Sequence, residues 1–315
     1  MTNCTKLKYS AYIPRTRKMT ATKATSEEIT LEEAVAQYLE SLQSSNRPAN
    51  TIAAYQTDLA QLVRFLQSSN LTSLGDVEPA NLLEYFGSLK QSYSMSTLNR
   101  KAVSLKLFLG YLTQAGVSEL QVPKDFPSFK VDKPPRMALT AEEVGHLFEV
   151  AALNCSSPTR LRNYAMLVLS YATGLKATEL VSLSVEQVNL DKAYVYCRNS
   201  SWPERRVSFS EEVGAVIDYY ITEGRPILVK GRDNGKLFLS ETRGKQVTRA
   251  WLFAVLKEYG AQAGIHVNST VLRNTFAFNI PNQDMSRLQF NELLGNHWSS
   301  VRNRYFTSSA VSTSP

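Results

Sequence analysis

The side chains best suited to chemistry lie near the end of this chain, in three short pieces between residues 265 and 315. Arg273 comes first, Asn296 and His297 follow a Leu-Leu-Gly run, and Tyr305 comes last. A guanidinium can donate two parallel hydrogen bonds to phosphate oxygens, an imidazole can transfer a proton near neutral pH, and a tyrosine hydroxyl can act as a nucleophile. Each residue alone has a plainer explanation, because a helical arginine is usually a surface charge and a tyrosine usually packs half-buried. Order and spacing must decide between these explanations.

A fourth piece lies upstream, where residues 172–180 have the sequence Ala-Thr-Gly-Leu-Lys-Ala-Thr-Glu-Leu. Together the four pieces resemble the tyrosine recombinase (phage integrase, Xer-like) family. That family carries an Ala-Thr-Gly-Leu-Arg-x-x-Glu-Leu box, a His-x-Leu-Arg-His box, a Leu-Leu-Gly-His box and a tyrosine at a fixed distance past the last histidine. The pieces keep this order here, and Tyr305 keeps the distance, since it lies nine residues past Asn296. The resemblance covers about residues 31–306.

Several letters of these boxes depart from the family pattern. The first arginine of the family is Lys176 here. The two histidines of the second box are replaced by Thr270 and Asn274. The histidine of the third box is replaced by Asn296, and His297 stands one place later. The departures leave open whether this member still performs the chemistry of the family.

The resemblance implies two successive transesterifications that need no metal or cofactor. The oxygen of Tyr305 would attack a DNA phosphate to form a covalent 3′-phosphotyrosine, which a 5′-hydroxyl then reverses. A hairpin lysine of the family has its nearest counterpart in Arg198, and Arg205 matches the arginine of a Glu-Arg pair that usually follows the hairpin. The residues that would hold the phosphate are Lys176, Arg198, Arg273, Asn296 and His297.

Two functions follow from these observations. The first is a site-specific recombinase or integrase, encoded by a plasmid or phage, with an altered active site. The second is a recombinase-fold protein that binds DNA without cutting it, as a regulator or accessory subunit of a replicon. Lys176, Thr270 and Asn296 favour the second, whereas Arg273 and Tyr305 favour the first. Both predict double-stranded DNA as the partner, and the resemblance implies self-association from dimer to tetramer or pairing with a paralogous recombinase.

Composition is consistent with both functions. The 315 residues, 43% of them hydrophobic, suffice for two domains of ordinary size. The net charge of +7 favours a polyanionic partner. Three scattered cysteines argue against a disulfide framework or a zinc site, and no apolar run is long enough to span a membrane. We therefore expect a cytoplasmic protein without a metal.

The apolar spacing predicts a mainly α fold with a small β-sheet. We expect an N-terminal four-helix, SAM-like core-binding domain, and the resemblance implies a C-terminal α+β catalytic domain of the tyrosine-recombinase type. The expected helices of the first domain are 29–42, about 51–66, 79–89 and 96–112. In the second domain we expect strands at 193–198, 205–209 and 237–239, and a last helix at 301–306. The predicted segments are a disordered basic leader at 1–27, the helical domain at 28–120, a basic Pro-rich linker at 121–137, the catalytic-like domain at 138–308 and a tail at 309–315.

Basic side chains indicate where DNA would bind. Three lie on the polar side of the fourth helix and two in the linker, where they could neutralise phosphates. A solvated helix face and a solvated linker explain the same residues, so both explanations stay open. The predicted DNA-contacting residues are Arg100, Lys101, Lys106, Lys130, Lys133 and Arg205.

Overall fold

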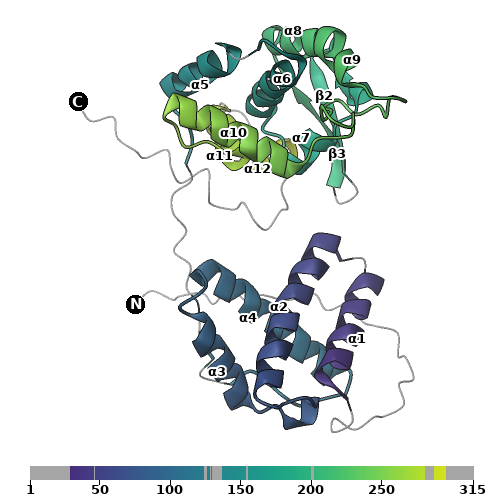
Figure 1. Cartoon of the computed structure of the whole chain (residues 1–315), viewed down its shortest axis with the longest axis vertical. Coiled ribbons are helices and arrows are strands. Elements are labelled where there is room, and N and C mark those ends of the chain that lie inside the picture. Colours follow the sequence, from purple (N-terminus) through teal and green to yellow (C-terminus); the bar gives the residue numbers. More distant parts are fainter. Residues whose placement is uncertain are drawn as a thin grey trace, which may run out of the picture. The chain divides into compact units, whose positions relative to one another are not determined.

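The computed structural model describes residues 29–45, 47–123, 126–127, 129, 137–153, 155–199, 202–280 and 287–295. The chain forms two compact units, Met1–Lys133 and Pro134–Pro315 (Figure 1). Helices dominate both units, and one small sheet lies in the second, so the predicted fold class is confirmed. The predicted leader, the helix at 301–306 and the tail lie outside the described residues. The finer segment boundaries stay predictions.

The four predicted helices of the first unit are confirmed to within two residues at each end. They are α1 (Leu31–Ser44), α2 (Ala49–Ser68), α3 (Pro79–Leu89) and α4 (Met95–Gln114). Polar side chains fix where they begin, because Thr30 and Glu33 form a reciprocal capping box at α1 and the Ser94 hydroxyl accepts from the Thr97 N–H at α4. Each helix buries an apolar stripe in one shared core.

Part of the predicted linker belongs to this core. The rings of Phe126 and Phe129 lie 4.8 and 5.7 Å from the ring of Phe86 on α3, centroid to centroid. Such aromatic contacts stabilise the packing beyond the area that they bury. Lys130 and Lys133, the two linker lysines predicted to contact DNA, lie outside the described residues.

The second unit combines short helices with a three-stranded antiparallel sheet of order β1-β2-β3. Its strands are β1 (Val188–Asn189), β2 (Tyr194–Asn199) and β3 (Trp202–Ser208). Its described helices are α5 (Ala141–Leu153), α6 (Pro158–Thr173), α7 (Ala177–Ser182), α8 (Glu211–Tyr219), the π-helical turn η3 (Tyr220–Gly224), α9 (Arg225–Leu228), α10 (Arg249–Ala263), α11 (Ser269–Asn279) and α12 (Arg287–Leu294).

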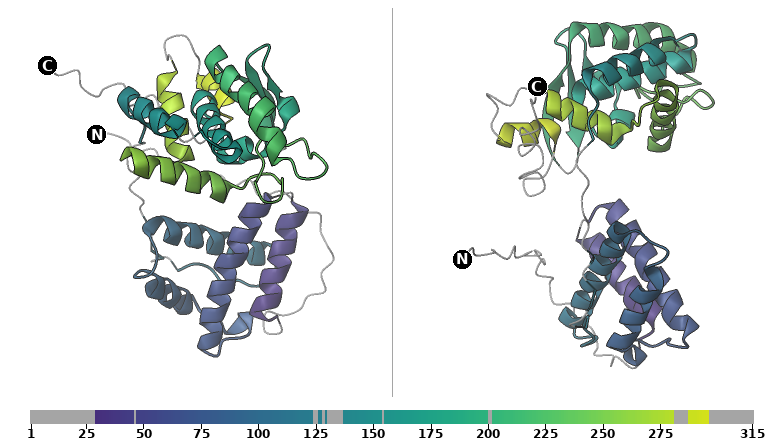
Figure 2. Two further views of the ribbon diagram at one scale, coloured as in Figure 1. Left: turned by 45° about the horizontal axis from the view of Figure 1, so that its top comes forward. Right: turned by 90° about the vertical axis from the view of Figure 1, so that its left-hand side faces the viewer.

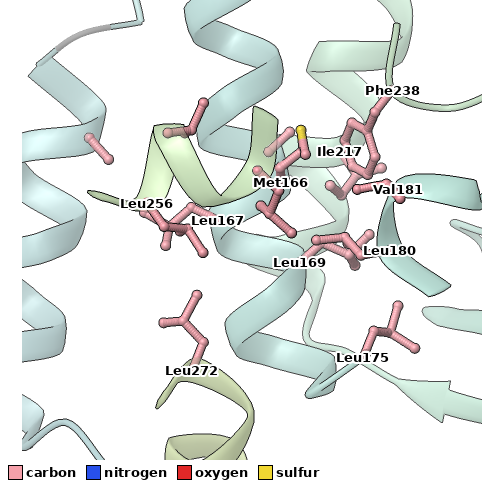
Figure 3. Close-up of a cluster of buried hydrophobic side chains, with 14 of the residues drawn as sticks. Met166, Leu167, Leu169, Leu175, Leu180, Val181, Ile217, Phe238, Leu256 and Leu272 are labelled. Carbon is pink, nitrogen blue, oxygen red and sulfur yellow. The ribbon is translucent and has the colours of Figure 1, made fainter. Parts of the chain in front are cut away.

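Helix α6 lies at the centre of this unit, where it packs against α5, α7, α8, α9, α10 and α11 (Figure 1, Figure 2). Its side chains Met166, Leu167 and Leu169 are fully buried. They share one apolar cluster with Leu180 of α7 and Leu272 of α11 (Figure 3). Because α7 and α11 carry two of the four sequence boxes, this core fixes where those boxes lie.

The prediction of a strand at 237–239 is wrong. Within the described residues the third strand of the sheet is β1, whereas Leu239 makes only an isolated bridge with Gln246. The apolar run is buried against loop backbone, since the Leu237 N–H donates to the Leu183 carbonyl over 2.8 Å. A buried loop therefore has the same apolar signature as a short strand.

Across the described ranges, the helices are too short or too polar to cross a lipid bilayer.

Candidate active site

The first box forms the turn between α6 and α7. Gly174 ends α6 with φ of 57°, a left-handed conformation that suits glycine. A Cβ atom at this position would lie 2.3 Å from Cδ1 of Phe276, so glycine also lets α11 approach closely. Lys176 follows as the N-cap residue of α7, and its backbone N–H donates to Oε2 of Glu179 over 2.8 Å. The turn thus presents the Lys176 side chain next to α11.

Glu179 and Arg205 form a buried bidentate ion pair. Nη1 and Nη2 of Arg205 lie 2.9 and 2.8 Å from the two carboxylate oxygens of Glu179. The two side chains are only 9% and 7% exposed. Burial raises the pKa of the Glu179 carboxyl, but the hydrogen bonds and charge of Arg205, together with Lys176, outweigh burial and hold the pKa below its usual value. Glu179 is therefore a charged anchor between α7 and β3.

Three cations converge on the C-terminal end of α12. The Leu293 carbonyl accepts from Nε of Arg205 over 2.9 Å, the Leu294 carbonyl from Nη2 of Arg273, and the Gly295 carbonyl from Nζ of Lys176. The last carbonyls of a helix lack partners within the helix and carry partial negative charge. We call Leu293, Leu294 and Gly295 the carbonyl end of α12.

Gly295 lets the guanidinium of Arg205 lie close to the carbonyl end of α12. Its φ is 58°, and an added Cβ would lie 2.6 Å from Nη1 of Arg205. A larger residue here would therefore displace the guanidinium that anchors β3 to α7. The glycine of the Leu-Leu-Gly run in the third box therefore has a structural role.

Arg273 joins the second box to the same place. It lies on α11, and its Nη1 donates to the Gly174 carbonyl over 2.6 Å. Arg273 and Lys176 therefore hydrogen-bond successive carbonyls of α12, although 97 positions separate them in sequence. We call Lys176, Glu179, Arg205 and Arg273 the Glu179 cluster. It holds three cations and one carboxylate, so a bound phosphate would offset part of its positive charge.

Arg198 is not part of this cluster. Its neighbour Cys197 pairs across the hairpin with Arg205 on the buried face, and the strand register shifts between Cys197 and Asn199. The side chain of Arg198 is 73% exposed, with its Nε 3.0 Å from Oε1 of Glu204. The prediction that Arg198 holds the phosphate has no support in this geometry.

The two former histidine positions of the second box differ in their surroundings. Thr270 is exposed in the first turn of α11. Asn274 is buried, and its Nδ2 donates to the Met137 carbonyl over 3.0 Å. Asn274 therefore ties α11 to the segment before α5. Asn296, His297 and Tyr305 lie outside the described residues, so their roles stay predictions.

The first unit holds a second buried charge cluster. The Asp58 carboxylate on α2 accepts from Nζ of Lys101 over 2.9 Å and from Arg100. Nζ of Lys101 also donates to Gln61 over 2.7 Å and lies 5.0 Å from the ring centroid of Tyr93. We call Asp58, Gln61, Tyr93, Arg100 and Lys101 the Asp58 cluster.

The predicted DNA-contacting residues differ in how exposed their side chains are. Lys101 is only 4% exposed, so its placement on the polar side of α4 was wrong, because Asp58 draws its ammonium inward. Arg205 is likewise buried, and its guanidinium is committed to Glu179 and Leu293, which leaves its predicted contact with DNA unsupported. Arg100 is partly exposed beside Asp58, and Lys106 is exposed over the Phe126 ring. Arg100 and Lys106 keep a side chain that DNA can reach.

Sequence reasoning missed the structural role of Asp58 and Glu179. Asp58 lies three positions after Tyr55 and four before Leu62, so these three residues share one face of the helix predicted at about 51–66. A carboxylate on a buried helix face requires a cation partner, so this spacing was the available signal. Glu179 lies three residues after Lys176, the spacing of a capping box.

Within the part of the chain that the structure describes, no three His, Cys, Asp or Glu side chains gather as metal ligands would.

Comparison with known sequences identifies the family. The "Phage integrase family" model matches residues 137–311, and the "Phage integrase, N-terminal SAM-like domain" model matches residues 35–116. The chain belongs to the phage integrase family. One relative in this family, tyrosine recombinase XerC of Roseiflexus castenholzii, is 34% identical over 254 residues, which cover 79% of this chain and 80% of that protein. Tyrosine recombinase XerD of Pasteurella multocida is 30% identical over 259 residues, 78% of this chain and 83% of that protein.

The fold of this phage integrase family member also matches solved structures. A lambda integrase dimer bound to a COC′ core site superposes with a TM-score of 0.68 at 14% identity, covering 91% of this chain and 80% of that one. At this identity the likeness concerns the fold. It supports the combination of a helical N-terminal domain with a catalytic-type domain.

Proposed function

We propose that this phage integrase family member is a site-specific DNA recombinase of the tyrosine type. It cuts and rejoins duplex DNA through a 3′-phosphotyrosine intermediate. The observation that carries the proposal is the meeting of Lys176 and Arg273 at the carbonyl end of α12, in the segment that leads to Tyr305. The family relatives named as tyrosine recombinases agree with this reaction class.

A DNA phosphate could replace the hydrogen-bond acceptors of Lys176 and Arg273. Both donate hydrogen bonds to backbone carbonyls at the carbonyl end of α12. Phosphate oxygens carry more negative charge than a helix terminus, so a DNA phosphate can replace the carbonyls as the acceptor. The Arg273 guanidinium and the Lys176 ammonium would then stabilise the charge that develops on the non-bridging oxygens.

The remaining residues divide into nucleophile, further ligands and positioning groups. Tyr305 is the proposed nucleophile, with Asn296 and His297 beside the phosphate. Arg205 is a positioning residue, because its contacts hold the N-terminus of α7 and the carbonyl end of α12 in one place. Since a lambda integrase is solved as a dimer on DNA, we propose that this chain also self-associates on duplex DNA. A cytoplasmic location and a plasmid or phage origin stay predictions.

A second candidate is a recombinase-fold protein that binds DNA without cutting it. Asn274 favours this function, because the side chain that replaces a family histidine is buried in a structural hydrogen bond. Both candidates predict binding that weakens as salt rises, through exposed cations such as Lys106. Only the recombinase predicts a covalent link to DNA.

The test is a covalent-adduct assay that needs no knowledge of the target site. The protein is incubated with supercoiled plasmid at low salt, and the products are examined for relaxed DNA and for protein that stays attached in detergent. We expect both with the natural protein and neither with Tyr305→Phe. Tyr219→Phe is the matched control, because it removes the same hydroxyl from an exposed position on α8. Equal, salt-sensitive DNA binding by all three proteins, without any adduct, would favour the non-cutting candidate.

A further inference from the structure

Lys176 is the titratable cation of the Glu179 cluster. Its companions Arg205 and Arg273 are guanidinium groups, which hold their protons throughout the pH range of protein function. An ammonium has three donors and can release a proton once its surroundings lower its pKa. Among the described residues of the site, Lys176 is thus the cation that can both hold a phosphate and transfer a proton.

The hairpin of β2 and β3 does not supply a proton donor at Arg198. Its side chain is exposed and pairs with Glu204. Its guanidinium would not transfer a proton even if it turned toward the site. Protonation of the oxygen that leaves the phosphate therefore needs another donor.

We propose that Lys176 protonates the leaving 5′-oxygen when Tyr305 attacks the DNA phosphate, an inference that rests on the recombinase function proposed above. The bond between phosphorus and the tyrosine oxygen forms as the bond between phosphorus and O5′ breaks. The Lys176 ammonium gives one proton to O5′ and becomes a neutral amine, while the phenolic proton of Tyr305 passes to solvent. On rejoining, the bond between phosphorus and O5′ forms as the bond between phosphorus and the tyrosine oxygen breaks. The amine takes the proton of the attacking 5′-hydroxyl, so that Lys176 is again protonated, and the tyrosine oxygen regains its proton from solvent.

The placement of the Lys176 amine fits this role. Nζ donates to the Gly295 carbonyl while Arg273 donates to Leu294, the residue before it. One phosphate that replaces both carbonyls can therefore meet the Arg273 guanidinium with its non-bridging oxygens and the Lys176 ammonium with a bridging oxygen. The lysine side chain has four rotatable methylene groups and can follow the leaving oxygen as it departs.

The surroundings favour release of the proton. Charged groups face Lys176 from three elements: Glu179 on α7, Arg205 on β3 and Arg273 on α11. Burial lowers the pKa of the Lys176 ammonium; the charge of Glu179 raises it, and the charges of Arg273 and Arg205 lower it further, so that it lies below its usual value. An arginine at position 176 would hold the phosphate but would not give up a proton. Lysine in the place of the family arginine thus adds a function to this position.

The experiment compares two DNA substrates that differ in the leaving atom. The cleavage position is first mapped by sequencing the DNA that stays bound to the protein in detergent. Duplexes are then made with either oxygen or sulfur at the 5′-bridging position, because a thiolate leaves without needing a proton donor. Adduct formation is timed for the natural protein, Lys176→Arg, Lys176→Met, Arg273→Met and His297→Ala.

We expect Lys176→Arg to slow adduct formation by about 10²- to 10⁴-fold on the oxygen substrate, the usual contribution of a general acid, and to react nearly as fast as the natural protein on the sulfur substrate. Lys176→Met should also be rescued by sulfur, less completely, because it loses the positive charge as well. Arg273→Met should be slow on both substrates, since its role is to stabilise charge on oxygens that stay bonded to phosphorus.

Other outcomes separate this inference from the function on which it rests. A natural protein that forms no adduct on either substrate would overturn the recombinase function and the inference together. A natural protein that reacts, with Lys176 variants that are equally slow on both substrates, would overturn the inference alone and leave Lys176 as a phosphate ligand. Rescue by sulfur of His297→Ala, with no rescue of the Lys176 variants, would assign the acid to His297 instead.

Discussion

Each unit of the molecule buries one carboxylate among cations, and the two clusters use those cations differently. In the Asp58 cluster, Lys101 and Arg100 both donate to the carboxylate itself. In the Glu179 cluster the Arg205 side chain does so, while the side chains of Arg273 and Lys176 donate to the carbonyls of Leu294 and Gly295. The first cluster directs both of its cations to the carboxylate, whereas the second directs two of its cationic side chains to backbone carbonyls, which suits the phosphate binding proposed above.

The difference separates cations that hold a fold together from cations that can bind a ligand. A buried cation paired with a carboxylate is costly to separate, because either charge would be left alone in a medium of low polarity. A cation that faces a helix terminus meets only about half an elementary charge, and exchanges that partner for phosphate at much lower cost. By this criterion Lys101 and Arg205 are structural, whereas Lys176 and Arg273 are the proposed phosphate ligands.

The largest effect on stability should come from Glu179→Ala. The carboxylate accepts two hydrogen bonds from Arg205 and one from the Lys176 N–H, so its removal leaves a buried guanidinium without its partner. We expect the free energy of unfolding to fall toward the upper end of about 3–5 kcal/mol, the usual loss when a buried ion pair is broken. Urea unfolding followed by tryptophan fluorescence measures it, because all three tryptophans belong to the second unit.

Glu258→Ala is the matched control for this measurement. Glu258 is exposed on α10 of the same unit, and its loss should change the unfolding free energy by well under about 1 kcal/mol. Equal effects of the two substitutions would mean that the Glu179–Arg205 pair does not hold α7 and β3 together, and the distinction between structural cations and proposed phosphate ligands would fail.

Asp58→Ala should have the next largest effect, and in the first unit. Lys101 would keep its hydrogen bond to Gln61 and its contact with the Tyr93 ring, so we expect a loss near the lower end of about 3–5 kcal/mol. The first unit has no tryptophan, so far-UV circular dichroism should report the change while tryptophan fluorescence does not. Asp76→Ala, an exposed position of the same unit, is the control. A larger loss than in Glu179→Ala would reverse the order proposed for the two clusters.

The sequence allowed the helices to be predicted from local apolar spacing, and the meeting of two boxes from the resemblance to the family. Apolar periodicity placed the ends of α1 to α4 within two residues. The family order of the boxes led us to expect Lys176 and Arg273 at one site, and the structure brings them to adjacent carbonyls. Their catalytic roles stay predictions, because the described residues do not include Tyr305.

The predictions that failed concern residues whose positions depend on tertiary contacts, which local spacing does not reveal. Lys101 has the pattern of a solvated lysine until Asp58 of another helix draws it inward. Arg198 and Arg205 are both hairpin arginines, and only their tertiary contacts separate them, since Arg198 pairs with the exposed Glu204 and Arg205 with the buried Glu179. Charge identifies a residue that can bind phosphate, but the partner that already holds it decides whether it is available.

The smallest effect should come from an ion pair in which only the cation is buried. Arg225 is 8% exposed in its side chain, but its partner Asp233 is 47% exposed. Hydrogen bonds from Arg225 and from the Gly235 N–H lower the pKa of Asp233 to about 2. Because the folded pKa lies below the unfolded one, the stabilisation is complete above about pH 4 and is lost as the pH falls through about 2. Solvent screens this exposed carboxylate, so we expect Asp233→Asn to cost only about 0.2–1 kcal/mol near neutral pH.

Urea unfolding of both proteins at a series of pH values, followed by tryptophan fluorescence, should show this difference shrinking toward zero as acid is added. A difference that stays constant with pH, or that equals the loss in Glu179→Ala, would show that burial of the carboxylate does not set the strength of these pairs.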